Sequence, residues 1–264
     1  EWDGDYNKWL ELGGKFKYYN TMKAREVFKQ IAEAAWMCGD PGIWFVDTAQ
    51  RETFGTYINE KLKPTGVNPC GEQGLAAYNN CLLGAFVLTK YIKDGEFNWE
   101  KYSLDVRTAT RLMNNFSNIN QDKHPLKEQV DNDIFGKRIG IEITAFGDTC
   151  AFMGYRYGDA LSKVFANELS RKLLFESMDE SCEIAKENGP CAALKSIEDR
   201  ERFIDTCDYC PDVVDKLSHK ILKYGLANTS FNTIGPCGSI SIISGNTTSG
   251  IEPVFKFSYK RKNR

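Results

Sequence analysis

The sequence predicts an α/β protein with parallel strands. Two short apolar runs, 42–46 and 81–88, have the length and the β-branched or aromatic content of buried strands. A third run, 138–147, passes directly into a segment with helical spacing. Longer stretches with helical periodicity separate these runs, and such alternation is typical of parallel sheets. No internal repeat suggests another architecture.

The first part of the chain contains a predicted hairpin, a helix and a loop. Residues 1–20 alternate aromatic and polar side chains around Gly13 and Gly14, which predicts a β-hairpin. Residues 22–38 carry apolar side chains at helical spacing and end at a Gly/Pro-rich turn. Residues 61–80 contain glycines and prolines at short intervals, which predict a loop.

The second half of the chain is predicted to be mostly helical. Residues 101–119 and 158–188 have helical periodicity, and a Gly-Pro pair closes the longer stretch. Residues 200–228 have a mixed pattern, which predicts helical structure. Residues 229–245 predict a strand, a Gly-rich turn and a further short element.

Composition excludes several classes of protein. The formal net charge of −2 gives no bulk attraction to DNA or RNA. No apolar run approaches the length of a membrane span, and the acidic, aromatic N-terminus is unlike a signal peptide. Nine irregularly spaced cysteines in 264 residues argue against a secreted disulfide framework. We therefore expect a reduced, cytoplasmic protein with no nucleic-acid or membrane partner.

Chemically reactive side chains gather in the loop at about 64–80 and at its end. Asn68, Cys70 and Glu72 occupy alternate positions, so on an extended stretch their side chains point the same way. Cys81 follows at the start of a predicted strand. A carboxylate base, an amide and two thiols suit redox or radical chemistry on a hydroxylated substrate.

Other interpretations of these thiols stay open. A nucleophilic cysteine needs a histidine base, and neither histidine of the chain is in a recognisable pairing. A zinc site would need more ligands at C-x-x-C or similar spacing. Cys70 and Cys81 could also be small buried side chains, with Glu72 exposed to solvent. Residue types alone do not decide between these alternatives.

A Gly-rich turn at 235–241 follows the strand-like segment. Its backbone N–H groups, with the hydroxyls of Ser239 and Ser241, are able to cradle a phosphate. An ordinary β-turn is the alternative.

Both segments resemble parts of ribonucleotide reductases. NPCGEQ, followed by Cys81 and the strand CLLGAFVL, resembles the active-site finger loop, whose Asn-x-Cys-x-Glu pattern carries the chemistry. PCGSISIISGNTTSGIEP resembles the family's phosphate-binding segment, in which Thr is common at the position of Cys237. Residues 24–45 and 138–158 resemble further units of the family. The resemblance therefore covers nearly all of the chain in family order.

The resemblance implies a role for each residue of the two motifs. Cys70 would become a thiyl radical that abstracts the 3′-hydrogen of the ribose, and Glu72 would be the general base on the 3′-hydroxyl. Asn68 would hydrogen-bond in the ribose pocket, and Cys81 would belong to the thiol pair that reduces the substrate. No metal ligand is expected. The turn residues that would hold the substrate phosphate are Pro236, Cys237, Gly238, Ser239, Ile240 and Ser241.

The resemblance also implies a fold and a cofactor. The family's α/β barrel has ten strands in two five-stranded halves around a central finger loop, and residues 1–264 would form part of this catalytic barrel. The Gly-Ser-Ile-Ser turn and the GDPGI segment look most like the adenosylcobalamin-dependent class. The expected reductant is an external dithiol such as thioredoxin. Large subunits of the iron- or manganese-dependent enzymes, which need a separate radical-generating subunit, are the alternative.

Other parts of the family's machinery are expected outside residues 1–264. The first redox cysteine and the effector loops would come before, and the C-terminal cysteine pair would come after. We therefore expect the isolated chain to be inactive and to work with the remainder of the enzyme as a separate chain or segment. A rival hypothesis is a barrel module that binds nucleotides without turnover.

Cys207 and Cys210 form a C-x-x-C outside both motifs. We interpret them as incidental cysteines in a variable insertion. A zinc site at this pair is a third hypothesis, although it would need two more ligands.

Overall fold

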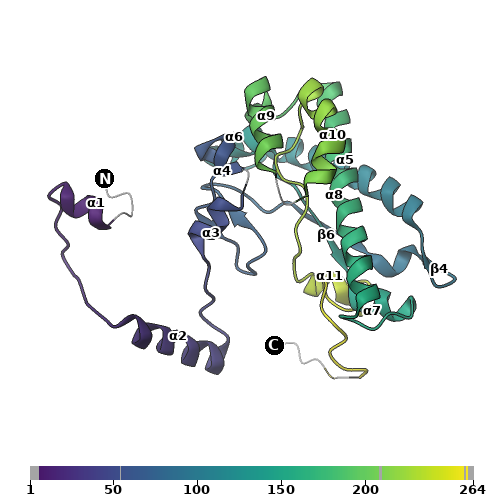
Figure 1. The fold of residues 1–264 in the computed structure, drawn as a ribbon, viewed down its shortest axis with the longest axis horizontal. Coiled ribbons are helices and arrows are strands. Elements are labelled where there is room, and N and C mark those ends of the chain that lie inside the picture. Colours follow the sequence, from purple (N-terminus) through teal and green to yellow (C-terminus); the bar gives the residue numbers. More distant parts are fainter. Residues whose placement is uncertain (1–5, 54, 208–209, 259, 261–264) are drawn as a thin grey trace. The chain divides into compact units, whose positions relative to one another are not determined.

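The computed structural model describes residues 6–53, 55–207, 210–258 and 260. These residues divide into two units, one that ends at Trp44 and one that begins at Phe45. The ribbon of Figure 1 shows the first unit in purple and the second in blue to yellow.

The first unit contains two helices, α1 (Tyr6–Glu11) and α2 (Ala24–Cys38). The helix predicted over 22–38 is confirmed as α2. It ends because Gly39 adopts a left-handed conformation with φ 84° and donates its N–H to the carbonyl of Ala35.

The hairpin predicted over 1–20 is wrong for the residues described. Helix α1 occupies part of the range, and residues 1–5 lie outside the described residues. Gly13 donates its N–H to the carbonyl of Leu10, and Gly14 donates to that of Trp9. The two glycines therefore cap a helix instead of turning a hairpin.

The strand predicted at 42–46 is also wrong. Residues 42–45 have no regular structure, and Val46 begins helix α3. An apolar run becomes a strand only when another strand satisfies its backbone hydrogen bonds, and no described segment pairs with this one.

The second unit is mainly helical, with short strands. Its α-helices are α3 (Val46–Arg51), α4 (Gly55–Ile58), α5 (Trp99–Gln121), α6 (Lys127–Gly136), α7 (Phe146–Phe152), α8 (Ala160–Asn188), α9 (Ile197–Thr206), α10 (Pro211–Tyr224) and α11 (Gly238–Ile243). Its 3₁₀ helices are η1 (Glu60–Leu62), η2 (Leu88–Tyr91) and η3 (Ala192–Leu194). Its strands are β1 (Gly66–Val67), β2 (Gly74–Leu75), β3 (Leu83–Val87), β4 (Ile92–Lys93), β5 (Glu96–Phe97) and β6 (Gly140–Thr144).

Three parallel segments form the centre of this unit. β3 and β6 pair in parallel, from Leu83 opposite Gly140 to Val87 opposite Thr144. Residues 230–233 run along the other edge of β6, with a parallel bridge at Asn232. This arrangement confirms the predicted α/β class. Across the described residues the named strands form three two-stranded sheets and no closed barrel.

The predicted long helices and the strand–helix unit are confirmed. α5 and α8 cover the predicted ranges 101–119 and 158–188, and β6 with α7 covers 138–147. The strand predicted at 81–88 is present as β3, but its residues are half-buried or exposed instead of buried. No helix in the described part of the chain is long and apolar enough to cross a bilayer.

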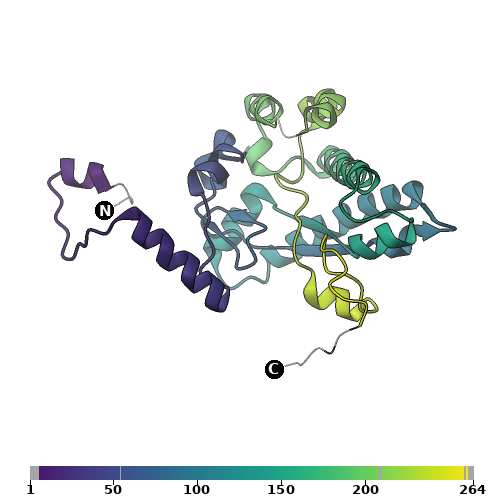
Figure 2. The same cartoon turned by 60° about the horizontal axis from the view of Figure 1, so that its bottom comes forward.

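Two clusters of buried apolar side chains hold the second unit together. The first lies among α8, α9 and α10, which Figure 2 shows with α9 and α10 seen nearly end-on. The second lies between β6 and the helices α5, α7 and α8, and contains Ile139, Ile141 and Ile143. Because side chains alternate along a strand, Glu142 of β6 points away from this cluster.

Candidate active site

The predicted finger loop is a tight β-hairpin. β1 and β2 pair antiparallel, with Gly66 opposite Leu75 and Val67 opposite Gly74. These short strands lie inside a range that the sequence indicated only as a loop. The pairing leaves residues 68–73 as the tip of the hairpin.

Asn68 closes the hairpin tip. Its side-chain Oδ1 accepts a hydrogen bond of 2.9 Å from the backbone N–H of Gln73, and its own N–H donates to the Gln73 carbonyl at 3.2 Å. The Asn68 carbonyl accepts from the N–H of Gly71, whose φ of 85° suits glycine. Asn68 therefore organises the loop that carries Cys70 and Glu72.

Cys70 and Glu72 differ in their exposure. Cys70 is exposed at the tip of the hairpin. Glu72 is half-buried, and its Oε2 is fully buried with no hydrogen-bond partner among the described residues. The carbonyl of Glu72 accepts from the hydroxyl of Thr233 at 3.3 Å, which fastens the tip to the parallel segment 230–233.

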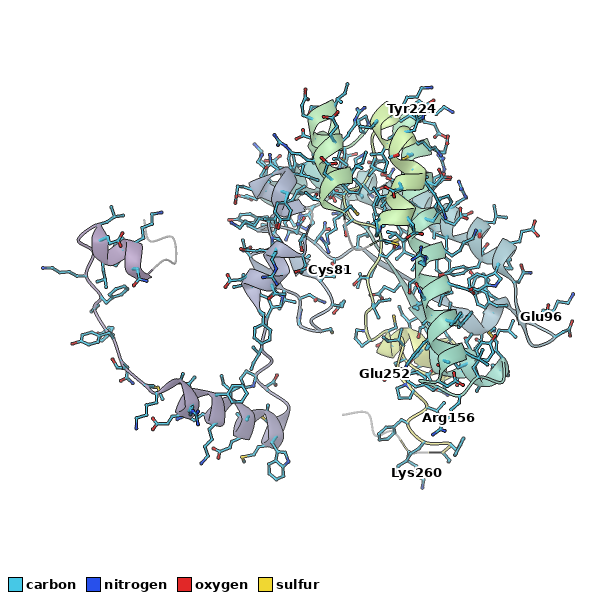
Figure 3. All side chains as sticks on the ribbon, viewed as in Figure 1. Cys81, Glu96, Arg156, Tyr224, Glu252 and Lys260 are labelled. Carbon is cyan, nitrogen blue, oxygen red and sulfur yellow. The ribbon has the colours of Figure 1, made fainter. Side chains whose placement is uncertain are left out.

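Cys81, labelled in Figure 3, lies near both the hairpin tip and β6. The Cys81 side chain is exposed, but partial burial of its thiol raises the pKa above the ordinary value. The positive charge of Arg138 opposes this rise, whereas the negative charges of Glu72, Glu142 and Cys70 add to it. Cys81 is therefore within electrostatic reach of Cys70 and Glu72.

Glu142 belongs to this site, although the sequence did not identify it. Its carboxyl is buried on β6, its Oε2 accepts a hydrogen bond of 3.1 Å from the Cys237 thiol, and its Oε1 has no partner in the part of the chain described. Burial raises its pKa, and the charge of Glu72 raises it further, while the Cys237 hydrogen bond and the backbone of Gly235 lower it. The available signal was a single acidic residue within an otherwise apolar strand.

The turn at 235–241 lies against the same carboxyls. Cys237 has a left-handed backbone with φ 48° and precedes helix α11. Burial raises the pKa of its thiol to about 12, with contributions from the hydrogen bond to Glu142 and from the charge of Glu72. The thiol of Cys237 therefore faces the interior of the site, not a surface phosphate.

The remaining turn residues vary in their availability to a ligand. Pro236 and Ser239 are exposed, and Gly238 and Ile240 are half-buried. Ser241 is buried, donates its hydroxyl proton to the carbonyl of Gly238 at 2.8 Å, and lies 3.0 Å from the hydroxyl of Ser249. The Ser241 hydroxyl is therefore already engaged in holding the turn.

A cavity of about 500 Å³ adjoins the hairpin. It is lined by Gly74, Arg138 and Thr233, among others, but by none of the side chains of Cys70, Glu72, Cys81, Glu142 and Cys237. The Arg138 guanidinium approaches Gln73 at 3.4 Å, and burial lowers its pKa. This volume falls in the range of small-molecule sites, roughly 300–1,000 Å³.

Cys207 and Cys210 are buried, and Cys210 also lines this cavity. Both side chains belong to the first core cluster, and residues 208–209 between them lie outside the described residues. Among the residues that the structure describes, no three His, Cys, Asp or Glu side chains are placed to hold a metal ion.

The family model described as "Ribonucleotide reductase, barrel domain" matches residues 2–264. The chain belongs to this family. Within the ribonucleotide reductase barrel domain, the hairpin tip and the 235–241 turn are the two segments that the sequence singled out.

Several named relatives resemble the chain over most of its length. The vitamin B12-dependent ribonucleoside-diphosphate reductase of Thermoplasma acidophilum is 28% identical over 93% of this chain and 29% of its own length. The vitamin B12-dependent ribonucleotide reductase of Streptomyces avermitilis is 25% identical over 94% of this chain and 28% of its own. The ribonucleoside-diphosphate reductase large subunit of Variola virus is 23% identical over 99% of this chain and 34% of its own length. The chain spans about a third of the length of these curated relatives.

Proposed function

We propose that this chain carries the radical thiol and the general base of a ribonucleotide reductase, which converts ribonucleotides to 2′-deoxyribonucleotides. One observation carries the proposal. Thr233 donates its hydroxyl to the Glu72 carbonyl at 3.3 Å and its N–H to Ile141 of β6 at 3.2 Å, and the Cys237 thiol donates to Glu142 of β6 at 3.1 Å, so the hairpin tip and the distant turn meet at β6. Relatives with reductase names support the same reaction.

Each group of the site has a proposed role. Cys70 lies at the hairpin tip, where it would receive the radical and abstract the 3′-hydrogen of the ribose. Glu72 has a buried oxygen without a partner, which can accept the proton of the 3′-hydroxyl. The raised pKa keeps Cys81 a thiol, the form that can donate hydrogen while it becomes half of a disulfide.

Substrate would be held at its sugar and its phosphate. Because Oδ1 of Asn68 is occupied by Gln73, we propose that the Asn68 amide group, Nδ2, binds the ribose. The phosphate would be held by backbone N–H groups of the 235–241 turn and by the exposed hydroxyl of Ser239. A Cys at 237 in place of Thr leaves these backbone contacts intact.

In the whole protein, we propose that the parallel segments belong to a larger barrel. β3, β6 and residues 230–233 would be neighbouring strands of the ten-stranded α/β barrel, and the hairpin 64–80 would be its central finger loop. The remainder of the enzyme, with the first redox cysteine and the C-terminal cysteine pair, would come from a further segment or chain.

Adenosylcobalamin is the proposed source of the radical, and a thioredoxin-like dithiol is the proposed reductant. The relatives named as vitamin B12-dependent support this class. The chain itself supplies the sulfur that would receive the radical, Cys70 at the tip of the hairpin. When bound, adenosylcobalamin would generate the radical without a separate subunit.

A class I large subunit is the second candidate. The Variola virus relative is named as a large subunit and covers 99% of this chain. The two classes differ in one measurable requirement, because only the adenosylcobalamin-dependent class needs no radical-generating protein.

Turnover by the whole protein that carries this chain tests the proposal. Ribonucleoside diphosphates or triphosphates are supplied with a dithiol and adenosylcobalamin, and 2′-deoxyribonucleotides are quantified. We expect sustained product formation, which Cys70→Ser reduces to background because a hydroxyl is a far poorer radical carrier than a thiol. Cys38→Ser is the matched control, since Cys38 is exposed on α2 and belongs to the first unit, whereas the residues of the proposed site all belong to the second.

The alternatives give different results in the same assay. Product formation that requires an added radical-generating subunit, and not adenosylcobalamin, would favour the class I large subunit. Nucleotide binding without any product in the complete system would favour a binding module and would refute the proposed reaction.

A further inference from the structure

Glu142 is a buried carboxyl that the proposed reaction does not yet use. It lies in the middle of β6, opposite Ala85 of β3, and is 2% exposed. Its side chain lies on the face of β6 that packs against the hairpin tip. Gly140, two residues earlier on the strand, faces the same way, and a Cβ added to it would lie 2.8 Å from the side chain of Gln73 in the hairpin tip.

The protein holds the Glu142 carboxyl in a defined orientation. Cys237 donates its thiol proton to Oε2 at 3.1 Å. On the other side, a Cβ on Gly235 would lie only 2.3 Å from Oε1, so the absence of a side chain at position 235 makes room for the carboxyl. Two residues of one turn therefore fix the place of a side chain on a strand.

Two carboxyl oxygens of the site are buried without partners. They are Oε1 of Glu142 and Oε2 of Glu72, and no other carboxylate of the described residues has such an oxygen. The charge of Glu72 raises the pKa of Glu142, so the two groups are within electrostatic reach. Burial of an unpaired polar oxygen costs free energy, which a ligand with hydrogen-bond donors would recover.

The chemistry of the pair fits a sugar with hydroxyl groups on adjacent carbon atoms. An ionised carboxylate accepts hydrogen bonds from hydroxyls, and a neutral carboxyl both accepts and donates. Under the proposed function, Glu72 takes the 3′-hydroxyl of the ribose, and the neighbouring hydroxyl is the 2′-hydroxyl. A second carboxyl close to Glu72 is therefore placed to receive it.

We propose that Glu142 binds the 2′-hydroxyl of the ribonucleotide and that Cys237 is the positioning residue that orients Glu142. The proposal rests on the proposed function and adds a determinant of specificity to it. With this contact, the site distinguishes the ribonucleotide substrate from its 2′-deoxyribonucleotide product.

Equilibrium binding without reductant tests the contact. The whole protein and its Glu142→Ala variant are titrated with ribonucleoside 5′-diphosphates and with their 2′-deoxy and 3′-deoxy analogues. The wild type should prefer the ribonucleotide over the 2′-deoxy analogue, and Glu142→Ala should lower this preference roughly tenfold to a hundredfold. The preference over the 3′-deoxy analogue should stay, because Glu72 is intact.

Variants of Cys237 test the positioning role. Cys237→Ala should lower the preference for the 2′-hydroxyl, and Cys237→Ser, which keeps a hydrogen-bond donor, should restore it. A merely structural role for Cys237 would weaken the binding of all three nucleotides alike. Glu201→Ala is the control, since Glu201 is exposed on α9.

The outcomes separate this contact from the proposed reaction. An unchanged ratio of ribonucleotide to 2′-deoxynucleotide affinity in Glu142→Ala, with product still formed, would overturn the contact and leave the reaction standing. A wild type that neither binds ribonucleotides nor forms product would overturn both. If the alanine variant does not fold, Glu142→Gln keeps the side-chain volume and should lower the preference in the same direction by a smaller factor.

Discussion

Two regions of the second unit contain buried or partly buried carboxylates, and they treat them in opposite ways. Between α5 and α8, Arg107 contacts Glu176 at 2.5 Å and also pairs with Asp179, while Arg111 contacts Glu180 at 2.5 Å. These carboxylates are at most 13% exposed, yet each of them meets a cation.

In the site around β6, two carboxylates lack hydrogen-bond partners among the described residues for one of their oxygens. Glu72 and Glu142 each have a buried oxygen without a hydrogen-bond partner in the part of the chain described. Buried charge is normally paired, because removal of a charge from water without compensation is costly. The paired carboxylates therefore stabilise the fold, whereas the unpaired ones are retained at a cost to stability, as is typical of a site whose ligand supplies the missing partners.

The largest difference between the site around β6 and the α5–α8 region should be the effect of a substitution on turnover. Glu72→Gln removes the proposed base and should lower turnover roughly 10²–10⁴-fold. The free energy of unfolding should stay the same or rise, since the variant removes a partly desolvated charge. Deoxyribonucleotide formation and urea unfolding are measured on the same preparation.

Glu201→Gln is the matched control for this change, because Glu201 is an exposed glutamate far along the chain on α9. Wild-type turnover by Glu72→Gln would show that its unpaired oxygen has no role in the reaction, and the contrast between the two regions would then lose its functional meaning.

The helical region should respond in the opposite way. Arg107→Met removes the cation that Glu176 and Asp179 share, although Lys172 and Lys220 stay beside them. It should lower the free energy of unfolding by about 1–3 kcal/mol, toward the lower end because Arg107 is partly exposed. Turnover per folded molecule should not change. Urea unfolding at neutral pH measures the loss.

Arg202→Met is the control for the arginine substitution. Arg202 and Asp199 form an exposed pair at 3.7 Å, so its loss should cost no more than about 1 kcal/mol. Equal losses in the two variants would mean that burial does not distinguish the interhelical network from a surface ion pair.

The two regions also differ in how far they could be predicted from the sequence. α5 and α8 were predictable because helical periodicity is repeated over many turns, and β6 with α7 because an apolar run passes into such a pattern. The hairpin predicted over 1–20 and the strand predicted at 42–46 were wrong because a strand also needs partner strands, which a local sequence pattern does not reveal. Closure of a barrel likewise depends on strands distant in sequence.

The candidate site was predictable where a contiguous motif carries it. Asn68, Cys70 and Glu72 are close together in sequence, so the motif is visible in the chain. The extended stretch expected there is a turn in the structure, with Cys70 exposed and Glu72 half-buried. Glu142 was missed because its significance arises only where β6 meets the hairpin tip and the turn at Cys237. The engagement of Asn68 Oδ1 by Gln73 was also hidden, since it depends on the closure of the hairpin.

The smallest expected effect is in how the free energy of unfolding depends on pH, for which Asp179 and Glu142 should contribute with opposite signs. Burial alone would raise the pKa of Asp179, but hydrogen bonds from Lys220 and Arg107 outweigh burial and hold its pKa below the ordinary value of 3.8. The stability that Asp179 contributes is therefore complete above pH 3.8 and is lost as the pH falls through the lower folded-state pKa. The destabilisation caused by Asp179→Asn should accordingly shrink in acid.

Glu142 should show the reverse sign. Its folded-state pKa is raised above the ordinary value of 4.5, so the folded protein binds more protons than the unfolded chain above that pH, and stability falls as the pH rises through the folded-state pKa. Glu142→Gln removes this titration, so its stability relative to the wild type should increase as the pH rises above 4.5. Urea unfolding of both variants from about pH 2 to about pH 8 includes the acid range in which Asp179 titrates, and it gives two difference curves. Curves of the same sign would mean that Glu142 is as well compensated as Asp179, and that the site needs no ligand to complete it.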